Sequence, residues 1–235
     1  DCSSRGLGDV YKRQVLGVAI IPPYETYITY EVYIAPGLIA MIQLFNGMQS
    51  SLSMVYDREM GSMKTMLVSP IPRWFLLTSK LLAGVFVSIL QVYAFLIIAS
   101  FWDIIPPVKG YLTLLPALII SGLMLGSLGM FLSSAIKQLE NFAGVMNFVI
   151  FPMFFASSAL YPLWKIEETS EWLFYICQFN PFTYAVEVIR FSMYSSFNYE
   201  YTLGIFIFAT IFLICSIIGY DPVSYTHLTL PTSYP

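Results

Sequence analysis

Residues 57–80 read DREMGSMKTMLVSPIPRWFLLTSK, a strongly polar stretch between two apolar runs that are each long enough to cross a bilayer. We interpret this stretch as a cytosolic elbow that carries a short amphipathic helix. In such a helix Met60, Met63 and Leu67 lie at i, i+3 and i+7 and share one face. Ser69-Pro70 then ends the helix, because proline disfavours helical geometry in the preceding residue and has no N–H to donate. The alternative is a charged loop that only sets topology.

The rest of the chain has the composition of a membrane protein. Hydrophobic residues make up 57% of it and charged residues 11%, which is too apolar for an ordinary soluble domain. The net charge of -3 argues against nucleic acid as a partner. Five apolar runs reach the length of about 20 residues that a helix needs to cross the hydrocarbon core, namely 34–55, 81–100, 112–132, 142–160 and 201–219. We therefore predict an all-α fold, a polytopic bundle of membrane-spanning helices.

Basic residues set the expected orientation of the bundle. Segment 56–80 is short and holds four of them: Arg58, Lys64, Arg73 and Lys80. Short loops rich in lysine and arginine stay in the cytosol. Counting spans outward from this segment places 133–141 and the C-terminus inside, and it places 101–111 and 161–200 outside.

The two ends of the chain need a separate interpretation. Residues 1–14 and 221–235 resemble translated sequencing-adaptor read-through at the ends of proteins from metagenomic assemblies, so we take 15–220 as the transmembrane domain. The topology places 22–33 outside, preceded by the apolar residues 15–21. We interpret these as the outer end of a truncated first helix. Five spans are then visible of an original six, with both ends in the cytosol.

The sequence offers little for catalysis or metal binding. His227, the only histidine, and Cys2 fall in the excluded ends, while Cys177 and Cys215 are too few and too far apart to suggest a metal site. No Gly-Lys dipeptide occurs, so a phosphate-cradling loop of the form GxxxxGK[ST] is absent. The apolar runs contain neither an acidic dyad nor a paired nucleophile and base. We therefore expect a non-catalytic membrane subunit.

A polar stripe runs along the first apolar run. Gln43, Asn46, Ser50 and Ser53 recur at steps of three and four, and Asn147 marks a weaker stripe in the fourth run. Buried amides in a membrane turn toward another helix or a water-filled path, because facing lipid would leave them unsatisfied. The stripe is expected to line a substrate path or a dimer axis, or else to hold helices together.

The third run has a different pattern, with small residues four or three apart. Gly122, Gly126, Gly129 and Ser133 fit the small-xxx-small arrangement that lets helix backbones approach closely. We interpret this pattern as helix packing.

The outer segment 161–200 is too long and too aromatic for a plain loop. It predicts one or two short helices, with Asn180 as N-cap and Pro181 at the first helical position. Glu187 and Arg190 are three residues apart and can pair on one helical face. The alternative is a surface helix that lies in the membrane interface, anchored by Trp164, Trp172 and Tyr175.

Two sets of residues resemble the signatures of a known family. Arg58-Glu59, Gly61, Leu67 to Pro70, Arg73 and Lys80, in this order, resemble the cytosolic signature of ABC-2 type transporter permeases. Asn180 to Ala185, followed by Arg190, is similar to the Asn-Pro helix start that this family places outside, before its last span. The resemblance covers roughly residues 15–220.

The resemblance implies specific roles for these segments. It implies a coupling helix that docks on a separate cytosolic ABC ATPase subunit through Arg58, Glu59, Gly61, Met63, Leu67, Ser69 and Pro70. It also implies a re-entrant extracellular helix that roofs the translocation path and includes Asn180, Pro181, Glu187 and Arg190. No cofactor is expected on this chain, because ATP and Mg would bind to the partner subunit. Six crossings make half a pathway, so we expect two permease copies around a two-fold axis, identical or paralogous.

The leading hypothesis is the permease subunit of an ATP-driven ABC-2 type exporter, a multi-pass protein of the bacterial inner (plasma) membrane. The export direction comes from the resemblance, and the cargo is left open. The alternative is a secondary transporter or channel that is not coupled to ATP. Such proteins keep ionisable residues at mid-membrane. The five runs have none well inside them, which argues against ion coupling.

Overall fold

The computed structural model describes residues 30–61, 73–101, 108–136 and 138–219. Within these ranges the chain forms helices and no strand, which confirms the all-α prediction. The helices are α2 (Tyr30–Glu59), α4 (Arg73–Ser100), α5 (Val108–Ala135), α6 (Leu139–Phe155), α7 (Leu163–Thr169), α8 (Glu171–Phe179), α9 (Pro181–Met193) and α10 (Tyr199–Gly219). Both ends that the sequence marked as foreign lie outside the described residues.

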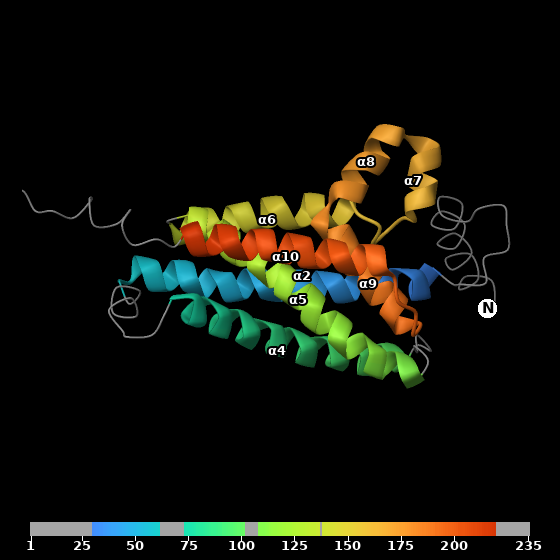
Figure 1. Cartoon of the computed structure of the whole chain (residues 1–235), viewed down its shortest axis with the longest axis horizontal. Coiled ribbons are helices and arrows are strands. Elements are labelled where there is room, and N and C mark those ends of the chain that lie inside the picture. The colour runs from blue at the N-terminus through green and yellow to red at the C-terminus, as the bar shows by residue number, and fades with distance from the viewer. Residues whose placement is uncertain (1–29, 62–72, 102–107, 137, 220–235) are drawn as a thin grey trace, which may run out of the picture.

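The long helices run along one axis and form a bundle (Figure 1). By length and composition α2, α4, α5 and α10 are candidate membrane spans, with the spanning parts Val32–Glu59, Trp74–Ser100, Lys109–Ala135 and Tyr199–Gly219. Successive long helices run in opposite directions, so the end of α2 lies near the starts of α4 and α6 (Figure 1). The predicted alternation of spans is therefore confirmed for the described helices.

The fourth predicted span is shorter than the sequence suggested. Helix α6 has 17 residues and ends at Phe155, whereas the apolar run continues to Leu160. Ser157 explains the early end, because its hydroxyl donates to the carbonyl of Phe154 and accepts from the N–H of Ala159 (3.2 Å). These local bonds replace the helical ones. The helix is about 25 Å long, less than a hydrocarbon core of about 30 Å.

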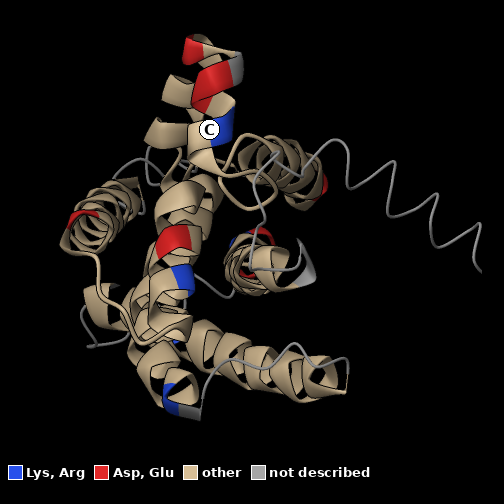
Figure 2. Cartoon of the chain, turned by 90° about the vertical axis from the view of Figure 1, so that its right-hand side faces the viewer, with Lys and Arg blue, Asp and Glu red and all other residues tan. Residues whose placement is uncertain are grey.

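Helix α5 lies at the centre of the bundle and packs against α2, α4, α9 and α10. Its side chains at Leu118, Met124 and Leu125 are fully buried, as are Leu44 and Met48 of α2. By contrast, α4 and α10 expose many large apolar side chains. In a membrane these outer faces meet lipid, so their exposure is the expected state of a spanning bundle. Charged residues are sparse along the bundle seen from one end (Figure 2).

Glycines bring the backbones of α2 and α5 into contact. A Cβ added at Gly47 would lie 2.9 Å from the Cα of Gly126, and one added at Gly129 would lie 2.8 Å from the carbonyl oxygen of Gly47. Contacts this short leave no room for a side chain at either position. The packing interpretation of the small residues in the third run is therefore confirmed.

Both ends of the polar elbow, residues 57–80, belong to the helices that flank it, which the sequence did not predict. Asp57, Arg58 and Glu59 belong to the last turn of α2, and residues 73–80 already belong to α4. The chain leaves α2 at Gly61, whose φ of 78° is in the left-handed region that favours glycine. Met60 lies in the turn before it, so the idea that Met60 shares a continuous helix face with the residues after Gly61 is wrong. Met63, Leu67, Ser69 and Pro70 lie outside the described residues.

The outer segment contains three helices, one more than the sequence suggested at most. Helices α7 and α8 pack against each other and project from the bundle (Figure 1). They expose three aromatic side chains of the predicted anchors: Trp164, Trp172 and Tyr175. Helix α9 instead lies against α2, α5 and α10, and most of its side chains are buried. The surface-helix interpretation is therefore wrong for α9.

Candidate functional site

Three residues of the polar stripe on α2, namely Gln43, Asn46 and Ser50, lie in different environments. Gln43 is the most buried of the three. Its side-chain Nε2 donates to the carbonyl of Leu118 (2.7 Å), and its Oε1 accepts from the hydroxyl of Ser121 (2.6 Å). Only 1% of Gln43 is exposed. Both ends of the amide therefore bind α5, which supports helix adhesion at this position.

Replacing Gln43 with leucine should measure that adhesion. We expect the variant to lose about 1 kcal/mol of unfolding free energy, because hydrogen bonds between membrane helices average about 0.6 kcal/mol each. Ser121→Ala should cost little once Gln43 is gone, so a double-mutant cycle in detergent unfolding should show coupling. Gln49→Leu, on an exposed part of the same helix, is the matched control. Unchanged stability of Gln43→Leu would instead favour a path-lining role.

Asn46 faces an open groove between α2 and α4, of about 520 Å³. Its Nδ2 donates to the Oε1 of Gln91 (2.7 Å) and to the carbonyl of Ile42 (2.8 Å). Gln49 also lines the groove, and apolar side chains form the rest of its wall, namely Leu38, Met41, Ile42, Phe45 and Phe95. The groove therefore combines three carboxamides with an apolar surface on the side of two spanning helices.

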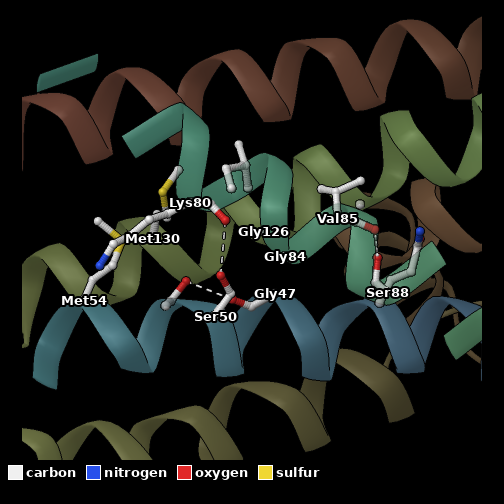
Figure 3. Close-up of a pocket in the computed structure, with 13 residues that line it drawn as sticks. Gly47, Ser50, Met54, Lys80, Gly84, Val85, Ser88, Gly126 and Met130 are labelled. Atoms are coloured by element: carbon white, nitrogen blue, oxygen red, sulfur yellow. Dashed lines mark hydrogen bonds between the residues drawn. The ribbon is translucent and has the colours of Figure 1, made fainter. Parts of the chain in front are cut away.

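Ser50 lies in a closed position where α2, α4 and α5 meet (Figure 3). Its hydroxyl donates to the carbonyl of Lys80 (3.5 Å), and a Cβ added at Gly84 would lie 2.8 Å from its oxygen. The cavity here is about 10 Å³, at the lower limit for one water molecule. No substrate fits in this space. Asn147, the remaining predicted path residue, is exposed on α6 and lines neither this cavity nor the groove.

The end of α2 contacts three other helices. Asp57 forms an ion pair with Lys80 of α4. Arg58 donates from Nη1 to the carbonyls of Ser134 (3.4 Å) and Ile136 (3.0 Å). Glu59 contacts α6, because its Oε2 accepts from the N–H of Leu139 (3.1 Å). Two residues predicted to touch a partner thus also bind this chain's own helix ends.

Asn180 joins two helices at the opposite end of the bundle. Its Oδ1 accepts from the N–H of Phe182 (3.0 Å), and Pro181 occupies the first turn of α9, so the predicted N-cap is confirmed. Its Nδ2 donates to the carbonyls of Met153 (2.7 Å) and Ala156 (2.6 Å), where α6 ends. Asn180 therefore caps α9 and also satisfies the carbonyls that α6 leaves unpaired.

Arg190 lies at the centre of a partly buried cluster in the same region. It pairs with Glu187, as the spacing predicted. Its Nη2 donates to the carbonyl of Ser158 (2.8 Å), which also accepts from the hydroxyl of Tyr33 (3.0 Å). The guanidinium carbon lies 4.2 Å from the centre of the Tyr33 ring, a cation–π contact. We call Tyr33, Ser158, Glu187 and Arg190 the outer cluster.

Two titratable side chains in this part of the molecule, Cys177 and Tyr194, have raised pKa values, which favours their neutral forms. Burial raises the pKa of the Cys177 thiol. It also raises the pKa of Tyr194, an effect that the charge of Arg190 partly offsets. Thiolate nucleophilicity at Cys177 is therefore suppressed. Among the described residues, no three histidine, cysteine, aspartate or glutamate side chains gather as metal ligands.

Several residues of these sites were not predicted from the sequence. Gln91 had a signal, because it is the one carboxamide in the apolar run 81–100. Tyr33 and Ser158 had none, since each acts through a contact with residues far away in the chain.

Comparison with known proteins gives a consistent set of matches. The model of the family described as ABC-2 type transporter matches residues 8–194, so the match begins inside 1–14 and stops before α10. The chain is 29% identical over 177 residues to the putative transport permease ycf38 of Porphyra purpurea, covering 74% of this chain and 59% of that protein. It is 29% identical over 170 residues to the probable multidrug ABC transporter permease YbhR of Escherichia coli K12, covering 71% and 45%. The aligned region thus spans about half the length of these relatives.

Proposed function

The chain belongs to the ABC-2 type transporter family, and we propose from this that it is the permease subunit of an ATP-driven exporter in the bacterial inner membrane. The observation that carries the proposal is the family match over residues 8–194, which includes every described helix except α10. The bundle of apolar helices supports the membrane setting. ATP and Mg would bind to a separate cytosolic ATPase subunit, and this chain would carry no catalytic step.

The end of α2 supports the location of the docking segment. Gly61 ends the helix with a positive φ, and nothing lies within 4 Å of the position where its Cβ would be. The described helices therefore leave open space around Gly61. We propose that the segment from Gly61 to Pro70, in particular Met63 and Leu67, binds the ATPase subunit.

The groove between α2 and α4 supports an amphipathic cargo or a second permease copy as its occupant. Carboxamides that face the membrane interior need a polar partner, because lipid provides none. Asn46 and Gln91 bind each other, and Gln49 is exposed beside them. We propose that the groove belongs to the transport path or to the two-fold axis of a permease dimer.

The docking proposal leads to a direct test. In a chain with Met63→Asp and Leu67→Asp, co-purification of a co-expressed ABC ATPase subunit should fall at least about tenfold, equal to about 1.4 kcal/mol. Charge on an apolar docking face must be desolvated when the complex forms. Ser195→Asp combined with Ser196→Asp places the same added charge on exposed residues at the opposite end of the bundle and should leave the complex intact.

The same experiment tests the function as a whole. If the unaltered chain binds no ATPase subunit and instead moves its cargo with an ion gradient, the secondary-transporter alternative is favoured. If it binds the subunit and both variants do as well, the docking segment lies elsewhere.

A further inference from the structure

Arg58 binds the end of α5 with favourable electrostatics. The two carbonyls that accept from its Nη1 belong to Ser134, in the last turn of α5, and to Ile136, just after the helix. Carbonyls at a helix C-terminus have no partner within the helix and carry partial negative charge. A guanidinium group is therefore well matched to this site, and its bonds fix the end of α2 to the end of α5.

Glu59 binds the start of α6 in the complementary way. Gln138 is the N-cap residue of α6, and its side chain makes no capping bond. The carboxylate of Glu59 instead accepts from the N–H of Leu139, the first helical residue. A carboxylate at a helix N-terminus is favourable because the free N–H groups carry partial positive charge. A residue of α2 thus supplies the cap that the sequence beside α6 does not supply.

These contacts matter because of how α6 is held in the bundle. Along its length α6 packs mainly against α2, and its outer end is fixed by Asn180. Glu59 adds a polar contact at its inner end. A movement of the end of α2 would act on the start of α6 and on the end of α5 through these hydrogen bonds.

We propose that Arg58 and Glu59 are positioning residues that transmit movement of the docking segment to α5 and α6, instead of contacting the ATPase subunit themselves. We call this pair the α2 clasp. The inference rests on the proposed function, because it assumes that an ATPase subunit displaces the segment after Gly61. One residue, Met60, separates the clasp from Gly61. Displacement of the docking segment is therefore applied directly to the helix ends that the clasp holds.

The test uses spin labels on cysteines placed at Ser79 of α4 and Glu140 of α6, both exposed, with the native cysteines replaced by serine. The chain and its ATPase subunit are reconstituted together, and the distance between labels is measured without nucleotide and with ATP and vanadate. We expect the distance between the labels to change with nucleotide in the otherwise unaltered chain. This change should be lost in Glu59→Ala. Glu59→Gln should restore the shift, because its amide oxygen still accepts from Leu139. Glu171→Ala, an exposed acid on α8, is the control.

Two further measurements separate the proposal from its alternatives. The ATPase subunit should co-purify with Glu59→Ala and with Arg58→Ala as it does with the unaltered chain. Loss of the complex in these variants would mean that Arg58 and Glu59 contact the ATPase subunit. A change in label distance that persists in Glu59→Ala would mean that the pair does not transmit movement of the docking segment. Either result overturns the proposal.

Amide exchange of Leu139 in the chain alone tests the clasp independently of any ATPase. It should become about fivefold faster in Glu59→Ala, the size expected for a lost helix cap. If the unaltered chain binds no ATPase subunit, the proposed function and the transmission fail together. Faster exchange would then still show the cap, whereas unchanged exchange would remove the clasp as well.

Discussion

Replacing Glu187 with alanine is expected to lower the unfolding free energy by about 3–5 kcal/mol, the range for breaking a buried ion pair by removing one partner. The side chains of Glu187 and Arg190 are 9% and 17% exposed, so water provides little compensation. The variant leaves the Arg190 charge buried without its carboxylate. Thermal unfolding of the purified chain in detergent should show a transition many degrees lower, with a smaller monodisperse fraction.

Replacing both charged partners together distinguishes the ion pair from a lone buried charge. Glu187→Gln combined with Arg190→Met removes both charges and keeps the approximate volume, so it should be less destabilising than Glu187→Ala. Some loss of unfolding free energy should remain, because Arg190 also donates to the carbonyl of Ser158. Glu168→Ala removes an exposed acid from the end of α7 and should leave the transition unchanged. If Glu187→Ala behaves like this control, the outer cluster does not stabilise the fold.

Replacing Gly47 with valine is the second change with a large expected effect. The new Cβ would lie 2.9 Å from the Cα of Gly126 and 3.0 Å from its N, and backbone atoms cannot rotate away as a side chain can. Helices α2 and α5 must separate, which lowers the unfolding free energy by at least about 1–3 kcal/mol. The expected result is a lower midpoint of thermal unfolding and less folded protein in the membrane.

The chain supplies a matched control for this substitution. Gly144→Val makes the same change in a helix, and nothing lies within 4 Å of the added Cβ. It should cost no stability, because valine loses no backbone contact there and has a higher helix propensity than glycine. Equal losses in both variants would show that the effect comes from valine itself and not from the contact between α2 and α5.

Much of the fold was predictable because long apolar runs allow few alternatives. A run such as 112–132 has to be a helix in a bilayer, since a lone strand would leave its backbone groups unsatisfied. The glycines of α5 also showed their packing role directly in their spacing. Local chemistry was equally informative at Asn180-Pro181, where a capping side chain and a ring with fixed φ define a helix start within two residues.

The predictions from the sequence failed mainly where contacts join distant parts of the chain. The sequence marked Gln43 and Asn46 as polar, but it could not tell that one binds α5 and the other faces a groove with Gln91. The early end of α6 is a local exception, because it depends on hydroxyl bonds of Ser157 with residues two and three positions away. The burial of α9 depends on its packing against three other helices. Docking through the elbow stays a prediction, since its residues 62–72 lie outside the described part of the chain.

The early end of α6 also has a consequence for biogenesis. When α6 leaves the ribosome, the carbonyls of Met153, Ala156 and Ser158 have no hydrogen-bond donors from later helices. Asn180, which donates to Met153 and Ala156, follows 24 to 27 residues later, and Arg190, which shares the Ser158 carbonyl with Tyr33, follows 32 residues later. We therefore expect stable integration of α6 to follow the synthesis of Asn180 and α9. A nascent chain arrested before Asn180 should leave α6 accessible to the insertion machinery, and one arrested after α9 should release it.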